Sequence, residues 1–429
     1  MSIYNYEQAF GVGDKTSASM RKAIARWFQM YYDGTATETV DPCQRIPYTL
    51  VNKLVKGMFG EYKASADTAF GEKLLKEIHT QKRRAMQLAL VGGACYIKPC
   101  PDKTGFSFTL IPRNQMLIFG ADSAGRPTDI GLVEKRVEGG YYYTLLERRT
   151  VDAEGYLSIR YKLHRSRDAQ NLGQEVSLNT IPVYSQLAEY YCYQKPIGSV
   201  GVVGLKLPML NCVDGSDDPV AIYAAAEGLI SNINENEAQM NGEFRRGESR
   251  VFASSDLLDK DLGLTDHLFV GLDDDPERVG LTVFSPQLRE QSYLARKQEY
   301  LRNVESLLGL KRGMLSDSNM EDRTATEITA SATEYSLTVM ELQSVWQKAL
   351  AELLALCSVL AELYAMAERE TGRLSIDWGN GTLYDQEKTW ADYMDMVSKG
   401  ILKPEVALAW RFGMEETDEK TIREKLMPN

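Results

Sequence analysis

The sequence predicts a helix-rich α+β protein that is organised around one very long helix. From Met314 to Thr371 the chain contains neither glycine nor proline, so nothing local interrupts a helix over that distance. Between Gly92 and about Pro182, apolar and polar residues alternate, and turn residues separate the runs, which is typical of antiparallel strands. With 429 residues, the chain is long enough for two or three domains and a sizeable core.

Composition and charge narrow the classes of function. Hydrophobic content of 44% and charged content of 25% are those of a soluble folded protein. The net charge of −11 argues against a protein that reads DNA sequence, because such proteins usually have a basic surface. The same net charge is compatible with a protein that DNA moves past without being bound tightly. The apolar runs, such as residues 349–356, are interrupted by charge and too short to span a bilayer, and residues 1–7 do not resemble a signal peptide. We therefore expect no membrane association and synthesis in the cytoplasm.

The N-terminal part of the chain predicts helices. Residues 17–32 carry an apolar stripe, and residues 45–91 predict two helices, the second over 70–91. Residues 11–16 end like a phosphate-binding loop but lack its first glycine and a preceding strand, so a turn before a helix is favoured. The basic run 82–84 is expected to be a solvated helix face. Strands are then predicted at the following ranges: 94–98, 107–111, 116–119, 131–136, 141–148 and 157–164.

The middle of the chain predicts two helices that flank a compact strand-like insert. The first helix covers residues 219–246, and its polar centre at 232–237 suits an aqueous space or a subunit boundary. Residues 214–219 faintly suggest a cation loop, but an N-cap followed by proline is favoured. The insert covers residues 248–285, with strands expected at 250–253 and 280–284. The second helix covers residues 287–308, and a polar linker, expected to be mobile, follows at 309–322.

The long helix is expected to begin at residues 323–327, where Thr324 and Glu327 have capping-box spacing, and to end at Gly372. About 48 residues would make a rod of roughly 70 Å. From Tyr335 to Ala367 a near-heptad apolar seam predicts cover by several neighbours, which we expect to include other subunits. A short strand at 374–378, a polar helix at 385–399, a helix through Trp410 and an acidic end at 415–425 complete the chain.

The sequence offers no catalytic constellation. It contains no nucleophile-elbow motif, no zinc-protease motif and no complete phosphate loop, and only three histidines. Six cysteines without a second metal-ligating pair are expected to be small buried apolar residues, and His267 is expected to be structural. We therefore expect no enzyme, no metal and no cofactor.

Four motifs, in this order, resemble the portal proteins of tailed bacteriophages, particularly those of long-tailed phages. These are residues 214–217 leading into the helix at 219–246, residues 245–252, residues 267–272 preceding 284–289, and residues 323–328 at the start of the long helix. The resemblance covers roughly residues 80–410. It implies a ring of subunits, usually twelve, at one capsid vertex, through which double-stranded DNA is packaged by terminase and later ejected.

On that template, residues 1–217 form helices and a β-rich wing. Residues 218–247 and 286–308 form the two stem helices, and residues 248–285 form the clip between them. Residues 309–323 form a tunnel loop, 324–372 the long wing or spine helix, and 373–429 a wing strand and the crown. The resemblance implies as partners further copies of the chain, passing DNA, the terminase large subunit, major capsid and scaffolding proteins, and a head–tail adaptor. It implies assembly in the bacterial host cytoplasm and a place in the virion.

The resemblance also implies two sets of site residues. Residues expected to face the DNA channel are Arg289, Arg296, Lys297, Arg302, Lys311, Arg312, Met314, Ser316 and Asn319. Residues expected to contact terminase or the adaptor are Arg250, Phe252, His267, Phe269, Asp273 and Asp274. The channel cations would supply weak, local attraction in a ring whose net charge repels phosphates. Equally, each could pair with an acidic residue of the neighbouring subunit.

Two other readings remain open at this point. One is another oligomeric phage protein, such as a head–tail adaptor or a tail component, although adaptors are usually much shorter. The other is a DNA-processing enzyme, a nuclease or motor, which would need a metal or phosphate site that the sequence does not present.

Overall fold

The computed structural model describes residues 6–32, 43–102, 105–123, 125–247, 250–254, 269–272, 281–284, 287–317, 325–379 and 386–412. It is a mixed structure with 47% helix and 22% strand, which confirms the predicted α+β class. The chain divides into two compact units. One comprises Met1–Lys56 with Ala64–Ser375, and the other comprises Gly57–Lys63 with Ile376–Asn429.

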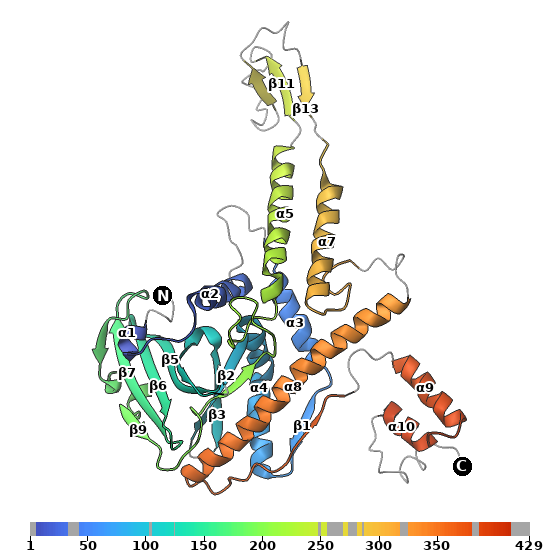
Figure 1. Ribbon diagram of the computed structural model, residues 1–429. Coiled ribbons are helices and arrows are strands. Elements are labelled where there is room, and N and C mark those ends of the chain that lie inside the picture. Colours follow the sequence, from blue (N-terminus) through green and yellow to red (C-terminus); the bar gives the residue numbers. More distant parts are fainter. Residues whose placement is uncertain are drawn as a thin grey trace. The chain divides into compact units, whose positions relative to one another are not determined.

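Two antiparallel sheets form the centre of the larger unit (Figure 1). The smaller sheet has the order β10-β2-β3, and the larger has the order β4-β5-β6-β7-β8, with β9 pairing β7. The strands are β2 (Ala94–Pro101), β3 (Phe106–Pro112), β4 (Met116–Ala121), β5 (Pro127–Glu138), β6 (Tyr141–Val151), β7 (Leu157–Ser166), β8 (Gln174–Val176), β9 (Tyr190–Cys192) and β10 (Val203–Lys206). The six predicted strands are confirmed. The sequence did not predict β8, β9 and β10, since each is too short to display an alternating pattern.

The N-terminal helices are α1 (Glu7–Phe10), α2 (Ala18–Tyr32), α3 (Ile46–Met58) and α4 (Ala69–Gly92). Helix α4 packs against β2 and β3. The hydroxyl of Thr68 accepts the Gly71 N–H at 3.1 Å and caps its start. Its end is fixed by Gly93, which has a φ of 81° and whose absent Cβ would lie 2.4 Å from the Pro219 carbonyl oxygen. These observations confirm the predicted helices in this region.

Helix α5 (Glu227–Arg246) begins later than the predicted residue 219. The preceding residues are buried against other elements instead: the Ile222 N–H donates to the Leu90 carbonyl at 2.9 Å, and the Tyr223 hydroxyl to the Trp27 carbonyl at 2.7 Å. These tertiary hydrogen bonds compete with helical ones, which is why the predicted start was wrong. The only regular element here is a 3-10 turn at Ala224–Ala226.

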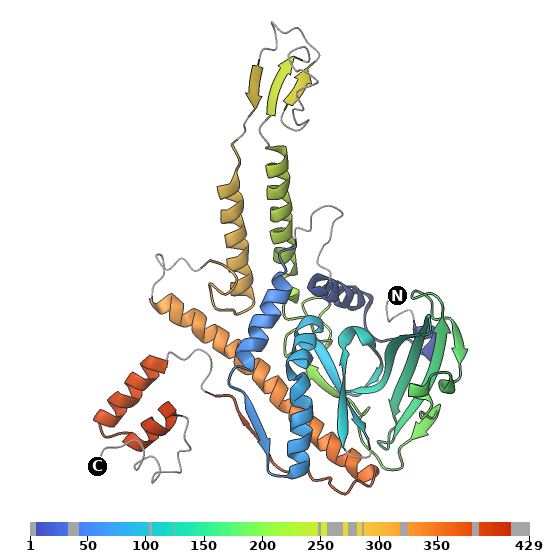
Figure 2. The same cartoon turned by 180° about the vertical axis from the view of Figure 1, so that it is seen from behind.

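Helices α5 and α7 (Glu290–Leu307) lie side by side (Figures 1 and 2). Between them in the chain is a three-stranded sheet of order β12-β11-β13. Its strands are β11 (Arg250–Ser254), β12 (Phe269–Leu272) and β13 (Leu281–Phe284). This arrangement confirms the predicted strands that open and close the insert.

Helix α8 (Ala325–Leu363) has 39 residues and is the long helix that the sequence predicts, but it does not reach Gly372. Ala365 has a φ of 50°, the Met366 N–H donates to the Ala361 carbonyl, and the Ala365 N–H donates to the Glu362 carbonyl. This pair of hydrogen bonds is the Schellman motif, which normally places glycine where Ala365 stands. Because alanine rarely adopts that conformation, this end of the helix could not be predicted from local residue types.

The apolar seam of α8 packs against β2, β10 and α4. Its buried members are Tyr335, Leu342, Trp346, Ala349, Leu353, Leu356 and Leu360. Part of the predicted cover of this seam therefore comes from the same chain. By length and composition alone, Thr333–Leu363 could also cross a membrane, contrary to our expectation, but half of its most apolar window is buried within the protein.

In the smaller unit, α9 (Gln386–Ser398) packs against α10 (Pro404–Phe412). The Trp378 ring lies 4.8 Å from the Tyr62 ring. Strand β1 (Lys63–Ala66) pairs with β14 (Leu374–Asp377) in a two-stranded sheet, and both strands span the chain positions at which the two units divide. The predicted strand and both C-terminal helices are confirmed. The acidic end at 415–425 lies outside the described residues.

Candidate functional site

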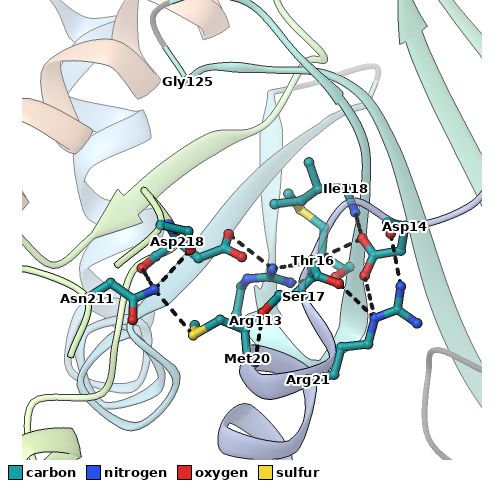
Figure 3. Close-up of polar contacts among 12 residues, drawn as sticks. Asp14, Thr16, Ser17, Met20, Arg21, Arg113, Ile118, Gly125, Asn211 and Asp218 are labelled. Atoms are coloured by element: carbon teal, nitrogen blue, oxygen red, sulfur yellow. Dashed lines mark hydrogen bonds and ion pairs between the residues drawn. The ribbon is translucent and has the colours of Figure 1, made fainter. Parts of the chain in front are cut away.

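The loop that resembles a phosphate-binding loop is part of a structural clamp (Figure 3). The Asp14 carboxylate accepts the Ile118 N–H at 2.7 Å, and Arg21 donates to the carbonyls of Asp14 and Thr16, each at 2.9 Å. The fully buried Arg113 donates to the Thr16 hydroxyl at 2.8 Å. Burial raises the pKa of Asp14, against the opposing effect of these hydrogen bonds and cations. Residues 11–17 form a turn and loop that lead into α2, so the predicted turn before a helix is confirmed.

The segment at residues 214–219 belongs to the same clamp. Asp218 forms an ion pair with Arg113 at 3.5 Å, and the Asp214 carboxylate accepts the Ser17 hydroxyl at the start of α2. The predicted N-cap of a helix at 219 is therefore wrong. Among the residues that the structure describes, no group of three or more His, Cys, Asp or Glu side chains could hold a metal ion.

The cysteines differ from the predicted pattern. Cys95 and Cys357 are buried, and burial raises the pKa of Cys95 to about 12. Cys192 and Cys212 are exposed, so the prediction of buried cysteines is wrong for these two. Cys43 and Cys100 are partly exposed.

The polar centre of α5 is turned partly toward α7. Asn236 is 2% exposed, and its side-chain N–H donates to the Tyr293 carbonyl at 3.0 Å. The Asn234 side-chain oxygen accepts the Gln44 N–H at 2.9 Å. The neighbouring Asn232 and Glu235 are exposed. The polar residues of α5 thus lie on two faces. Asn234 and Asn236 form hydrogen bonds with the segment just before α3 and with α7, and Asn232 and Glu235 are exposed to solvent.

Two predicted channel cations are paired within the chain. Arg289 donates two hydrogen bonds to the Glu243 carboxylate, at 3.1 and 2.9 Å, and these contacts hold the pKa of Glu243 down to about 2. Lys297 donates to Glu237 at 3.0 Å and to Gln44 at 2.6 Å. Both glutamates lie on α5, so these ion pairs join α5 to α7 and its N-cap. We expected such pairing only with a neighbouring subunit.

The other predicted channel cations are more available. Arg296 is exposed and donates to the Tyr300 hydroxyl at 3.0 and 2.8 Å, with no carboxylate within 4 Å among the described residues. Arg302 lies 3.7 Å from Glu299. Lys311 and Arg312 are both exposed, and Lys311 likewise has no carboxylate partner in the described part of the chain. Arg296 and Lys311 are therefore the best placed to attract an anion.

The first half of the predicted tunnel loop, residues 309–317, is held by one buried carboxylate. Glu305, at 1% exposure, accepts hydrogen bonds from the N–H groups of Gly313, Leu315 and Ser316 and from the Ser316 hydroxyl. Ser316 is therefore itself buried and turned toward Glu305. Lys53 of α3 donates to the Met314 carbonyl.

Helix α8 contacts the start of this loop. The Thr338 hydroxyl donates to the Gly309 carbonyl at 3.1 Å, and Gly309 has a φ of 59°. Leu310 is buried, and its N–H donates to the Glu305 carbonyl at 2.9 Å. The loop is thus fastened at both α7 and α8. The sequence did not predict four residues that make these contacts, namely Glu237, Glu243, Glu305 and Thr338. Acidic and hydroxyl residues are common on helices, so no local pattern distinguished these four.

The remaining predicted residues are only partly described. Arg250 and Phe252 lie on β11, and Phe269 lies on β12. His267, Asp273, Asp274 and Asn319 lie outside the described residues. A comparison with protein-family models finds no match to the chain, and a comparison with curated protein sequences finds none either.

Proposed function

We propose that this chain is a portal, or head–tail connector, protein of a tailed bacteriophage. It would assemble with copies of itself, twelve in the usual case, into a ring at one capsid vertex, and double-stranded DNA would pass through the ring. The observation that carries the proposal is the order of elements: helix α5, a three-stranded sheet, helix α7, a fastened loop and then the long helix α8 packed on a β-rich body. This order agrees with stem, clip, stem, tunnel loop and spine helix.

The distribution of charge is compatible with a conduit. A conduit benefits from weak and non-specific attraction, because tight phosphate contacts would hold the DNA. Arg289 and Lys297 are already neutralised by α5 glutamates, whereas Arg296 and Lys311 remain exposed without a carboxylate partner in the described residues. In the proposed ring, these few exposed cations would contact passing phosphates briefly. The terminase large subunit, the capsid and scaffolding proteins and a head–tail adaptor are the proposed partners.

Negative-stain imaging of the purified chain tests the assembly. We expect ring particles with a central hole. A monodisperse monomer across a range of concentrations and salt would contradict assembly of the isolated chain. Assays for ATPase and nuclease activity test the competing proposal of a DNA-processing enzyme, and we expect neither activity.

The double variant Lys311→Gln/Arg312→Gln tests the role of the loop. We expect rings of normal appearance together with a changed length or retention of packaged DNA. Packaging that is indistinguishable from that of the wild type would remove these two residues from the mechanism. A variant that forms no rings would show instead that the loop is needed for assembly.

A further inference from the structure

A cavity of about 630 Å³ lies where the end of α2, the first turn of α3 and one face of α4 meet. Three tyrosines, Tyr31, Tyr32 and Tyr48, and two arginines, Arg45 and Arg84, line it. Its volume falls in the range of roughly 300–1,000 Å³ that is usual for small-molecule sites. We call it the tyrosine–arginine cavity. The proposed portal function assigns no role to it.

The walls of this cavity are aromatic. The Tyr31 ring centroid lies 5.0 Å from that of Tyr32 and 5.7 Å from that of Tyr48. The floor includes Leu88 of α4, which is buried. Tyr32 and Tyr48 are nevertheless 57% and 53% exposed. Exposed aromatic rings gathered around one hollow are a stacking surface for a flat ligand, since such surfaces are uncommon on proteins without a binding role.

The rim of the cavity is cationic. The Arg45 guanidinium donates to the Tyr32 carbonyl at 2.8 Å, and the Arg45 backbone has a φ of 52°. That conformation is strained for arginine and persists only where the surroundings impose it, as is common at binding sites. Arg84 is exposed, and among the described residues no carboxylate lies within 4 Å of it. Guanidinium groups bind phosphate oxygens well because their planar donors match the anion.

We propose that the tyrosine–arginine cavity binds a nucleotide unit, with the base stacked on Tyr32 and Tyr48 and the phosphate held by Arg84 and Arg45. The shared chemistry is a flat base joined to an anionic phosphate. Its source is either a free nucleotide or single-stranded DNA, because the bases of a duplex are already stacked on one another. An acidic peptide would use the arginines but not the exposed ring faces, so the nucleotide is favoured. The proposal does not depend on ring assembly.

Fluorescence anisotropy of the full-length chain with labelled oligodeoxythymidylate tests the proposal at low salt. We expect binding that an unlabelled duplex of the same length competes for poorly. Competition with thymidine monophosphate distinguishes the two sources: displacement at similar nucleotide concentrations identifies a free nucleotide, and displacement only by the strand identifies single-stranded DNA. No binding of either ligand would overturn the proposal.

Matched variants locate the binding. We expect Tyr48→Ala and Arg84→Gln each to weaken binding about tenfold, and Tyr48→Phe to leave it unchanged, because stacking needs the ring and not the hydroxyl. Arg83→Gln is the control, since Arg83 is the exposed neighbour of Arg84 on α4 but does not line the cavity. Equal losses in Arg83→Gln and Arg84→Gln would show general attraction to a basic surface and would overturn the proposal. Displacement of the labelled strand by polyglutamate at matched charge would do so as well, since it would identify a site for acidic peptides.

Discussion

The carboxylate of Glu305 accepts hydrogen bonds from both the backbone N–H and the hydroxyl of Ser316, at 2.8 and 2.7 Å. Glu305 belongs to α7, whereas Ser316 lies at the far side of the loop that follows this helix. The N–H groups of Gly313 and Leu315 donate to the same carboxylate. Residues 309–317 therefore form an ordered turn that presents Lys311 and Arg312 on its exposed side, which differs from the mobile linker that the sequence suggested.

Replacing Glu305 by alanine would remove the acceptor for four donors at once. An unsatisfied buried donor costs about 1–3 kcal/mol, although relaxation of the loop toward water will recover part of the total. We expect Glu305→Ala to lower the free energy of unfolding by about 2–4 kcal/mol and to speed tryptic cleavage after Lys311 and Arg312. Urea unfolding and limited proteolysis measure the two effects.

The control for this variant is Glu299→Ala on the same helix, because the Glu299 side chain is 63% exposed. Its free energy of unfolding is expected to stay within about 0.5 kcal/mol of wild type. If Glu305→Ala and Glu299→Ala had the same stability and the same cleavage rate, Glu305 would not order the loop.

Ala365 ends α8 in a conformation that suits glycine. The corresponding residue at the end of α7 is Gly309, at a φ of 59°, and at the end of α9 it is Gly400, at a φ of 70°, with the same pair of backbone hydrogen bonds. We expect Ala365→Gly to raise the free energy of unfolding by about 0.5–1 kcal/mol, because relief of strain exceeds the added entropy of the unfolded chain. Thermal and urea unfolding would measure the gain.

The reverse change at Gly309 serves as the comparison. A Cβ there would lie 2.8 Å from the Thr338 hydroxyl oxygen and would adopt the same unfavourable φ. We expect Gly309→Ala to lower the free energy of unfolding by at least 1 kcal/mol. A stabilising Gly309→Ala together with a destabilising Ala365→Gly would contradict the role of these helix ends.

The sequence predicted the elements with strong periodicity and missed those determined by contacts with other parts of the chain. Strands β5 to β7 and helix α8 could be predicted because their apolar residues repeat with the period of a strand or a helix that has one buried face. The end of α8 at Leu363 was not, because Ala365 occupies a glycine position. The late start of α5 depends on buried hydrogen bonds of Ile222 and Tyr223, which no local pattern records.

The candidate site likewise has features that the sequence predicts and features that it does not. The clustering of cations on residues 289–312 was visible in the sequence, but their pairing was not. Whether Lys297 meets Glu237 depends on how α5 and α7 pack, and two helices separated by an insert can pack in many registers. The tyrosine–arginine cavity combines three helices, so it could not be inferred from spacing along any one of them.

Glu147 joins the two sheets through buried charges. Its carboxylate accepts hydrogen bonds from Lys98 of β2 at 2.8 Å and from Arg149 of β6 at 2.5 Å. Burial alone would raise the pKa of Glu147, but Arg149 and Lys98 together lower it to about 2. We expect Glu147→Gln to lower the free energy of unfolding by about 3–5 kcal/mol at neutral pH, because it leaves two cations without their carboxylate.

The pH dependence checks this assignment. Because the folded-state pKa of Glu147 lies below its ordinary value of 4.5, its stabilising effect is complete above that pH and is lost as the pH falls toward about 2. The difference in unfolding free energy between wild type and Glu147→Gln should therefore shrink from pH 5 to pH 2.5. A difference that stayed constant over this range would show that folding does not lower the pKa of Glu147, and a difference that grew toward low pH would show that folding raises it.

Arg296 and Lys297 are neighbours on α7 with different surroundings, so they separate stability from DNA attraction. Lys297 donates to Glu237 and Gln44, whereas Arg296 is exposed and contacts only the Tyr300 side chain among the described residues. We expect Lys297→Gln to lower the free energy of unfolding by about 1 kcal/mol, since two polar contacts of a partly buried charge are lost. Arg296→Gln should stay within about 0.5 kcal/mol of wild type. If the proposed ring forms, Arg296→Gln should also weaken the association of the ring with duplex DNA and flatten the dependence of that association on salt. Urea unfolding and DNA binding at several salt concentrations distinguish the two variants.

If Lys297→Gln flattened the salt dependence while Arg296→Gln did not, the assignment of Arg296 to the channel would be wrong.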